Sequence, residues 1–368
     1  MNILQLEIQL VAVVVAIACA LPGTFLVLRK MAMMSDAISH SILFGIVVAF
    51  FYTHDLSSPL LVLAATATGL LTALFVELLY KSRRVGEDAA IGLVFPFLFS
   101  IGVILISRYA GNIHLDTDAV LLGEIAFTPF ERLTIGGLDW GPKALYVMGG
   151  ILLLNILFIG ALYKELKLAT FDPALAAALG FSPAWIHYLL MGLVSLTAVG
   201  AFDAVGSILV VALMIGPPAA AYLLTDRLSH MLLLSAGIGV LGSIGGYWLA
   251  HVLNASIAGS MATIIGIVFV LVYLLAPERG VLALYRRRQQ QRLETAVTML
   301  LVHIRSHQHR TEAEDECHID HLYSHLKWDP QYTRRIIQHC QKEGWLYLKD
   351  DLLYLTEKGK AHIQQVAE

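Results

Sequence analysis

The sequence predicts two parts: an all-α polytopic membrane domain, followed by a small soluble α+β domain. Three observations predict this division. The 368-residue chain is 57% hydrophobic but only 14% charged, well below the roughly one quarter of charged residues that soluble proteins carry. The long apolar runs lie almost entirely within residues 1–280, and from Arg286 onward the sequence is polar and charged. We therefore expect a transmembrane domain over residues 1–285 and a soluble domain over residues 286–368.

The first part contains repeated segments that are long enough to cross a bilayer. A spanning helix needs about 20 predominantly apolar residues. We predict nine spans, although the sixth and seventh are short and interrupted by glycines, so that eight remain possible. They are residues 7–28, 34–53, 59–80, 88–107, 143–163, 186–201, 205–224, 229–252 and 259–276. The first is too long for a signal-peptide core, and its positive charges follow it, so we interpret it as a retained helix.

Positive charges set the predicted orientation of these spans. Lys and Arg residues follow alternate spans, at positions 29–30, 81–84, 164–167, 227 and 279–288. All five groups lie on the cytoplasmic side if the N-terminus is outside; Arg108, at the outer end of the fourth span, is the exception. This orientation also places the soluble domain in the cytoplasm.

The second span carries a carboxylate and an imidazole. Asp36 and His40 are four residues apart and therefore share one face of a helix. Ionisable groups in hydrocarbon are costly and usually face a polar pathway or a partner group. One oxygen and one nitrogen ligand suit Mn, Fe or Zn. We expect a metal pathway here; the alternative is a packing histidine beside an acid near the membrane surface.

Two loops carry further expectations. The outer loop, residues 108–142, is long and has an apolar middle, so it is either a re-entrant or surface-lying segment or an ordinary folded loop. The inner loop, residues 164–185, contains Asp172-Pro173, which favours a helix start, followed by Gly180, which favours a helix end. This short cytoplasmic helix either holds a peripheral partner or simply connects two spans.

Polar residues and prolines mark other spans. In the third span, we expect Glu77 to pair with Lys81 one turn further on. Asp203 lies near the start of the seventh span, which contains the double proline Pro217-Pro218. We expect the prolines to break the inner half of this helix and to free carbonyl groups, which is tolerable only where protein or a cavity covers them.

The soluble part shows the element order of a winged helix-turn-helix domain. We predict helices at residues 293–305, 318–326 and 330–343, a hairpin at 345–355 and a final helix. From Arg286 onward, 13 Lys and Arg residues face 12 Asp and Glu residues. The domain lacks the positive excess that drives DNA binding, so we favour a regulatory or docking role over DNA binding.

The soluble part is also rich in histidine. The pairs His303 and His307, and His321 and His325, are each spaced four residues apart, which suits chelation of a metal ion. A metal-sensing tail is therefore one hypothesis, and a set of scattered, solvated histidines is the other.

Four segments of the membrane domain resemble one protein family, the membrane permeases of ABC-type manganese, zinc and iron uptake systems. They are MSDAISHSILFGIVVAF at 34–50, EDAAIGLVFPFLFSIGVILIS at 87–107, FDPALAAALGFSP at 171–183 and VGSILVVALMIGPPAAAYLLT at 205–225. The resemblance runs over about residues 6–279. The segment QKEGWLYLKDDLLYLTEKGKAH, near the C-terminus, resembles the N-terminal domain of iron- and manganese-dependent repressors.

The permease resemblance implies a function and a set of partners. Such a permease lies in the bacterial inner membrane as a homodimer or close heterodimer. It receives a divalent ion (Mn, Zn or Fe) from an extracytoplasmic solute-binding protein, and a cytoplasmic ABC ATPase drives it. The ion is a substrate, and no permanently bound cofactor is implied.

The resemblance also assigns residues. Asp36 and His40 fall on the D-x-x-x-H ligands of the metal pathway. The cytoplasmic element that couples the permease to the ATPase covers Phe171, Asp172, Pro173 and Gly180. Three further acids are possible additions to the pathway: Glu87 and Asp88, which match a family motif and could instead cap their helix, and Asp203, where many relatives have a less polar residue.

The chain contains no G-x-x-x-x-G-K-[ST] motif. We therefore expect a transport subunit and not an enzyme, with ATP hydrolysis in a separate chain. The same observation fits a metal transporter driven by an ion gradient. A membrane-tethered, metal-responsive regulator is a further alternative, because of the soluble domain.

Overall fold

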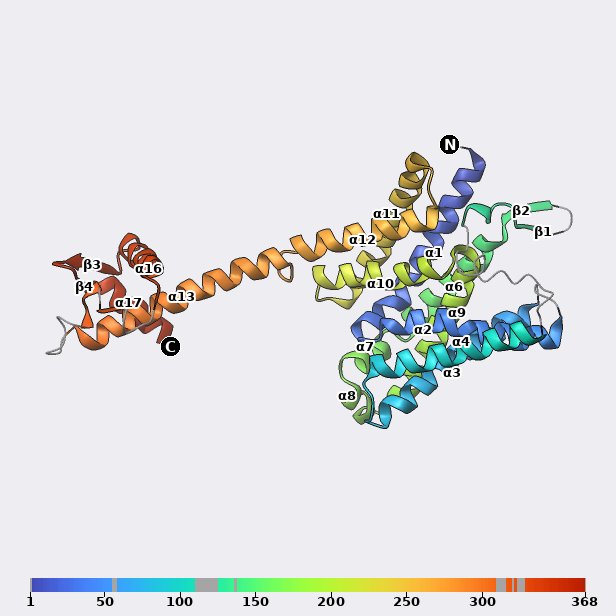
Figure 1. Ribbon diagram of the computed structural model, residues 1–368, viewed down its shortest axis with the longest axis horizontal. Helices are drawn as coiled ribbons and strands as arrows, with labels where there is room; N and C mark the ends of the chain where they lie inside the picture. Colours follow the sequence, from blue (N-terminus) through green and yellow to red (C-terminus); the bar gives the residue numbers. More distant parts are fainter. Residues whose placement is uncertain are drawn as a thin grey trace. The chain divides into compact units, whose positions relative to one another are not determined.

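The computed structural model describes residues 2–54, 58–109, 125–135, 138–308, 316–319, 321–322 and 328–367. They form two compact units, Met1–Gly280 and Val281–Glu368 (Figure 1). The first unit is mainly helical, and the second combines helices with a two-stranded hairpin.

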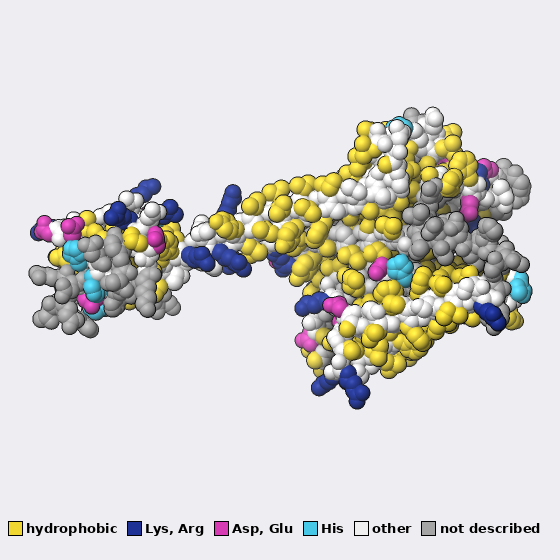
Figure 2. Space-filling view, in the orientation of Figure 1, with side chains coloured by type: hydrophobic (Ala, Val, Ile, Leu, Met, Phe, Trp, Pro, Cys, Tyr) yellow, Lys and Arg dark blue, Asp and Glu magenta, His cyan; other side chains and the backbone are white. Residues whose placement is uncertain are grey.

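Nine helices in the described part of the first unit are long and apolar enough to cross a membrane. They are α1 (Ile3–Leu28), α2 (Met33–Thr53), α3 (Pro59–Lys81), α4 (Glu87–Tyr109), α6 (Lys143–Ala161), α9 (Pro183–Val205), α10 (Ser207–Leu224), α11 (Leu228–Leu253) and α12 (Ile257–Leu275). This confirms the nine predicted spans. The sixth and seventh are separate helices because Gly206, with a φ of 80°, ends α9. Hydrophobic side chains cover most of the visible face of this unit (Figure 2).

The helices pack in two groups joined by α9. Helix α1 packs against α6, α10 and α11, whereas α2 packs against α3 and α4, and α9 contacts both groups (Figure 1). Buried polar side chains connect the helices, as is common where lipid provides no hydrophobic drive for association. Thr24 bonds to Ser235 at 3.2 Å, and Thr72 bonds to Ser41 at 2.7 Å. The first contact joins α1 to α11, and the second joins α3 to α2, the helix that carries Asp36 and His40.

The predicted break at the double proline is wrong: α10 continues through Pro217 and Pro218 to Leu224. Pro218 removes the N–H that would bond to the carbonyl of Met214. This carbonyl lies directly against Gly23 of α1, where a Cβ atom would come within 2.0 Å of its oxygen. The neighbouring helix therefore covers the freed carbonyl, which is a condition for proline in a membrane helix.

The described part of the outer loop is folded, with no re-entrant helix in it. Residues 110–124, which hold part of the apolar middle, lie outside the described residues. A short 3-10 helix (Ile125–Phe127) precedes an antiparallel hairpin of β1 (Arg132–Ile135) and β2 (Leu138–Pro142). Arg132 pairs with Asp139 across the hairpin and with Glu7 of α1, which attaches the loop to the first helix.

The inner loop contains the predicted short helix, α8 (Pro173–Ala178), after a further helix, α7 (Tyr163–Phe171), that was not predicted. The Asp172 carboxylate accepts a hydrogen bond from the backbone N–H of Leu175 at 2.9 Å, so it caps α8 as expected. Gly180, with a φ of 89°, follows the helix.

The second unit contains α13 (Val281–His307), α16 (Pro330–Lys342), β3 (Leu346–Lys349), β4 (Leu352–Leu355) and α17 (Glu357–Ala367). The third predicted helix, the hairpin and the final helix are confirmed. Asp329 caps α16, and Asp350 and Asp351, both with positive φ, form the two-residue turn of the hairpin.

The start of α13 differs from the prediction. It begins at Val281 and not at residue 293, because the Arg- and Gln-rich residues before 293 are good helix formers that lack an apolar period. The helix therefore runs through the expected domain boundary at residue 285. The predicted helix at 318–326 lies largely outside the described residues.

Candidate metal pathway and coupling surface

Asp36 and His40 face each other on α2. His40 Nε2 lies 3.4 Å from Asp36 Oδ1, and the two side chains are 30% and 33% exposed. The α2 residues around them are largely buried: Met34, Ser35, Ala37, Ile38, Ser39 and Ser41. The pair is therefore the polar strip that the packing of α2 leaves accessible, with one oxygen and one nitrogen donor side by side.

Aromatic side chains of α4 line one side of this pair. The His40 ring lies 5.8 Å from the ring of Phe95 and 6.2 Å from that of Phe99. Two glycines allow the close approach of the helices: a Cβ on Gly102 of α4 would lie 3.2 Å from the backbone of Phe44. On the other side of α2, a Cβ on Gly45 would meet Thr68 of α3 at 2.3 Å. The helix that presents the two donors is thus held between α3 and α4.

The three other predicted acids are not joined to the pair. Among the described residues, no hydrogen bond or ion pair connects Asp203, Glu87 or Asp88 to Asp36 or His40. Asp203 is exposed in the last turn of α9, and Asp88 is exposed in the first turn of α4. Glu87 is half-buried, and its Oε1 atom is buried without a hydrogen-bond partner within the described part of the chain.

A second polar group, which was not predicted, connects the end of α1 to the inner loop. Arg29 Nε donates to Thr170 Oγ1 of α7 at 3.1 Å, and Arg29 Nη1 lies 3.4 Å from His187 Nδ1 of α9. Burial lowers the pKa of Arg29 to about 10, so the guanidinium remains charged at neutral pH. These residues border a cavity of about 490 Å³. Arg29, Thr170 and His187 are far apart in the sequence, so no pattern of residue spacing could have predicted this group.

Glu77 lies on the same cavity. It pairs with Lys81 at 2.6 Å, as predicted, and also accepts a hydrogen bond from the Tyr188 hydroxyl. The cavity is therefore bordered by five elements: the ends of α1, α3 and α7 and the starts of α8 and α9.

The inner loop presents an apolar surface around α8. Its members are exposed large apolar side chains: Phe171, Leu175, Leu179, Phe181 and Trp185. We call this set the α8 surface. Asp172, Pro173 and Gly180 shape the helix at its centre. Exposed apolar side chains grouped along one short segment are typical of a protein interaction site.

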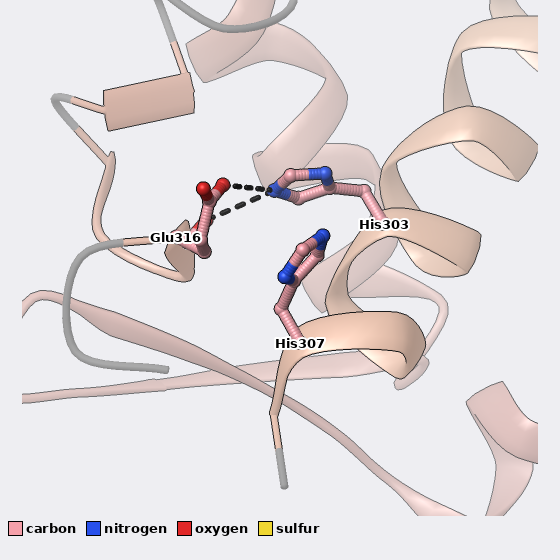
Figure 3. A group of neighbouring side chains, drawn as sticks. All are labelled: His303, His307 and Glu316. Carbon is pink, nitrogen blue, oxygen red and sulfur yellow. Dashed lines mark hydrogen bonds and ion pairs between the residues drawn. The ribbon is translucent and has the colours of Figure 1, made fainter. Parts of the chain in front are cut away.

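In the second unit, two of the predicted histidines meet an acid that was not predicted. His303 and His307 lie on the last turns of α13, next to Glu316 (Figure 3). His321 Nδ1 lies 3.4 Å from Glu316 Oε2, and His325 lies outside the described residues. Glu316 belongs to the charged run TEAEDE, in which nothing in the sequence distinguishes it from its neighbours.

Comparison with known proteins places the chain in a family. The model of the ABC 3 transport family matches residues 2–276. The chain is 46% identical over 357 residues to the zinc transport system membrane protein TroD of Treponema pallidum, with 97% of each chain covered. It is 51% identical over 284 residues to the manganese transport system membrane protein MntD of Bacillus subtilis, with 77% of this chain and 96% of MntD covered.

A solved structure gives a consistent result. PsaBC from Streptococcus pneumoniae in complex with Fab matches with a TM-score of 0.64 and 29% identity, and covers 77% of this chain and 96% of that chain. The match to TroD, which covers 97% of this chain, extends into the second unit. The chain therefore belongs to the ABC 3 transport family, and it is a membrane transport protein and not an enzyme.

Proposed function

We propose that this chain is the permease subunit of an ATP-driven importer of divalent metal ions, and that the ion passes the Asp36–His40 pair. One observation carries the pathway: a carboxylate and an imidazole 3.4 Å apart, each about one-third exposed, on a helix that is apolar enough to cross a membrane. Ionisable groups in such a position usually mark an ion path. The relatives TroD and MntD are named for zinc and manganese transport, and the donor pair suits Mn, Zn or Fe.

One chain supplies too few ligands for a complete site. A first-row divalent ion takes four or more ligands, and the pair offers two. We propose that a second permease subunit, either another copy of this chain or a close relative, supplies a second carboxylate and imidazole. Glu87, Asp88 and Asp203 would then serve as further binding positions along the path. Glu87 is favoured by its buried Oε1 atom, which has no hydrogen-bond partner among the described residues.

The energy for transport would enter at the α8 surface. We propose that a cytoplasmic ATPase docks on Phe171, Asp172, Pro173 and Gly180, and that ATP hydrolysis moves this element during alternating access. The hydrogen bond from Arg29 to Thr170 supports a route for the movement, since Arg29 directly follows α1 and lies four residues before α2. A push on α7 would thus reach the helix that carries Asp36.

The same proposal sets the orientation in the membrane. With the N-terminus outside, the nine spans bring the α8 surface and residues 286–368 to the cytoplasmic side of the inner membrane. The hairpin of β1 and β2 is then on the outer side, where an extracytoplasmic solute-binding protein would deliver the ion. We propose residues 1–285 as the permease domain on this basis.

For the second unit, we propose a winged-helix domain that docks a protein partner or regulates transport. The order of α13, α16, the β3–β4 hairpin and α17 supports this fold. The near balance of positive and negative charges from Arg286 onward disfavours binding to DNA. If the isolated full-length protein shifted a DNA probe at low salt with sequence preference, the regulator alternative would replace this part of the proposal.

Metal accumulation in cells tests the pathway. Cells that express the complete transporter with Asp36→Asn or His40→Gln should lose uptake of the transported ion. Glu278→Gln and His230→Gln are matched controls, because both side chains are exposed and lie outside the pair. Undiminished uptake of manganese, zinc and iron in both pathway variants would show that the ion does not use this pair.

A separate measurement tests the energy source. Uptake should stop when the ATP-binding lysine of the partner ATPase is substituted. If uptake continued at the normal rate and collapsed when the proton gradient was dissipated, the chain would be a gradient-driven transporter.

A further inference from the structure

We propose that the second unit holds its own binding site for a divalent transition-metal ion, formed by His303, His307 and Glu316 (Figure 3). The site is independent of the Asp36–His40 pair, because it lies in the other compact unit and is built from different residues.

The geometry of the three side chains suits one ion. Each offers one donor atom, and these atoms all lie within 4.8 Å of one another. His303 and His307 are one helical turn apart, with ring centroids 4.7 Å from each other. His303 Nε2 lies 3.6 Å from Glu316 Oε2. Metal–ligand bonds of about 2.1 Å separate neighbouring donors by about 3.4 Å, so small side-chain adjustments would complete the site.

Hydrogen bonding alone does not account for this arrangement. His303 Nε2 lies 3.0 Å from the backbone carbonyl of Glu316, which gives this nitrogen a hydrogen-bond partner; an ion bound at the same atom would replace that hydrogen bond. His307, however, has a buried Nδ1 atom without a hydrogen-bond partner among the described residues. A buried polar atom of this kind requires an explanation. A bound cation would supply one, since it would accept the lone pair of His307 beside the Glu316 carboxylate.

The donor set limits the ligand to a chemical class. Two imidazoles and one carboxylate are the donors that Zn, Fe and Mn use in proteins, and such sites follow the rising affinity from Mn to Zn. Three protein ligands leave at least one position open, so the ion can exchange. His321, whose Nδ1 lies 3.4 Å from Glu316 Oε2, would act as a positioning residue that orients the carboxylate.

Binding would tie together two parts of the unit. The residue after Glu316, Cys317, is buried, and its carbonyl accepts a hydrogen bond from the N–H of Leu353 in β4 at 3.1 Å. His318 also forms a bridge with Leu352. An ion shared by α13 and Glu316 therefore connects the end of the helix to the edge of the hairpin. We expect metal occupancy to rigidify this part of the unit.

Metal binding by the purified full-length protein tests the site. Asp36→Asn and His40→Gln are introduced together as a background, so that a failure of the pathway proposal cannot be mistaken for a failure of this one. In this background we expect about one equivalent of Co²⁺ to bind with visible absorption bands and to be displaced by Zn²⁺. Adding His307→Gln should abolish the absorption bands and the binding of this one equivalent of Co²⁺.

Three further variants make the result decisive. Glu316→Gln should also remove the equivalent, whereas His321→Gln should lower the affinity about 10- to 100-fold. His339→Gln is the matched control in the same unit and should change neither quantity. Monodisperse elution and an unchanged circular dichroism spectrum show that each variant is folded. If folded His307→Gln and Glu316→Gln proteins retained the equivalent and its spectrum, the site would be disproved.

Discussion

Two helices of this chain each carry candidate metal ligands one turn apart, and they differ in how far those ligands are withdrawn from water. On α2, Asp36 and His40 are each about one-third exposed and offer two donors. On α13, His303 is only 8% exposed, Glu316 is 18% exposed, and the cluster offers three donors. An ion that must pass on needs a site it can leave, whereas donors that are largely buried favour retention. The same helical spacing can therefore serve passage in one unit and retention in the other.

The largest effect should come from removing the passage ligands. Asp36→Asn or His40→Gln should reduce metal uptake to the level of cells without the transporter, because the ion would lose one of the two ligands that this chain offers on the proposed pathway. Scintillation counting of a radioactive manganese or zinc isotope measures this. In the same proteins, Co²⁺ binding at the α13 cluster should be unchanged. Loss of both quantities in one variant would mean that the two sites are not independent.

Metal should stabilise only the second unit. At a free zinc concentration of one hundred times the dissociation constant, a single site stabilises the folded state by about 2.7 kcal/mol. Backbone hydrogen exchange in the β3–β4 hairpin, which Leu353 joins to Cys317, should therefore slow on addition of zinc. A chelator should reverse the effect, and His307→Gln should abolish it. If zinc slowed backbone hydrogen exchange in α2 by the same amount, the Asp36–His40 pair would also retain the ion, and the proposed difference between the two sites would be wrong.

Substitutions on the α8 surface should weaken binding of the ATPase, which the proposed passage site needs and the α13 cluster does not. Leu175→Glu or Leu179→Glu places a charge on an exposed apolar patch, and we expect about tenfold less ATPase to co-purify. Leu348→Glu, an exposed apolar position on β3, is the matched control. Normal recovery of the ATPase with both α8 variants would place the docking site elsewhere.

Arg29 should affect coupling more than docking. Arg29→Gln removes the bonds to Thr170 and His187, so we expect the ions imported per ATP hydrolysed to fall several-fold while the ATPase still co-purifies. Lys30→Gln is the neighbouring control. An unchanged ratio of transport to hydrolysis would exclude this route.

The smallest effect concerns pH at the outer hairpin. The Gly141 backbone N–H, together with Arg132, lowers the pKa of Asp139 below its ordinary value of 3.8. The stabilising contribution of this carboxylate is therefore complete above pH 3.8 and is lost as the pH falls through the lowered pKa. The Gly141 amide should exchange more slowly in the unchanged protein than in Asp139→Asn, and only at a pH above the lowered pKa of Asp139. Equal protection in the two proteins at pH 7 would contradict this.

The sequence predicted features that depend on local pattern. The nine spans follow from apolar length, the Asp36–His40 contact from helical spacing, and α8 and the β3–β4 hairpin from their capping and turn residues. In each case the physical cause lies within a few residues of the element.

The features that were missed depend on contacts between distant segments. The continuity of α10 rests on Gly23, almost 200 residues away, which covers the carbonyl of Met214. The contact of Arg29 with Thr170 and the approach of Glu316 to α13 are likewise tertiary. A single sequence carries no signal for such pairs, because neither partner is unusual in its own segment.

The joint between α7 and α8 has a mechanical consequence. Asp172 belongs to both helices: its N–H donates to the carbonyl of Leu168 at 2.8 Å, and its carboxylate accepts from the N–H of Leu175 at 2.9 Å. No free residue remains between the two helices to absorb movement. We therefore expect a displacement of α8 to move α7 as well, because Asp172 alone separates the two helices and bonds to both. Inserting one flexible residue between α7 and α8 should leave the docking of a partner intact but prevent the movement of α8 from reaching α7.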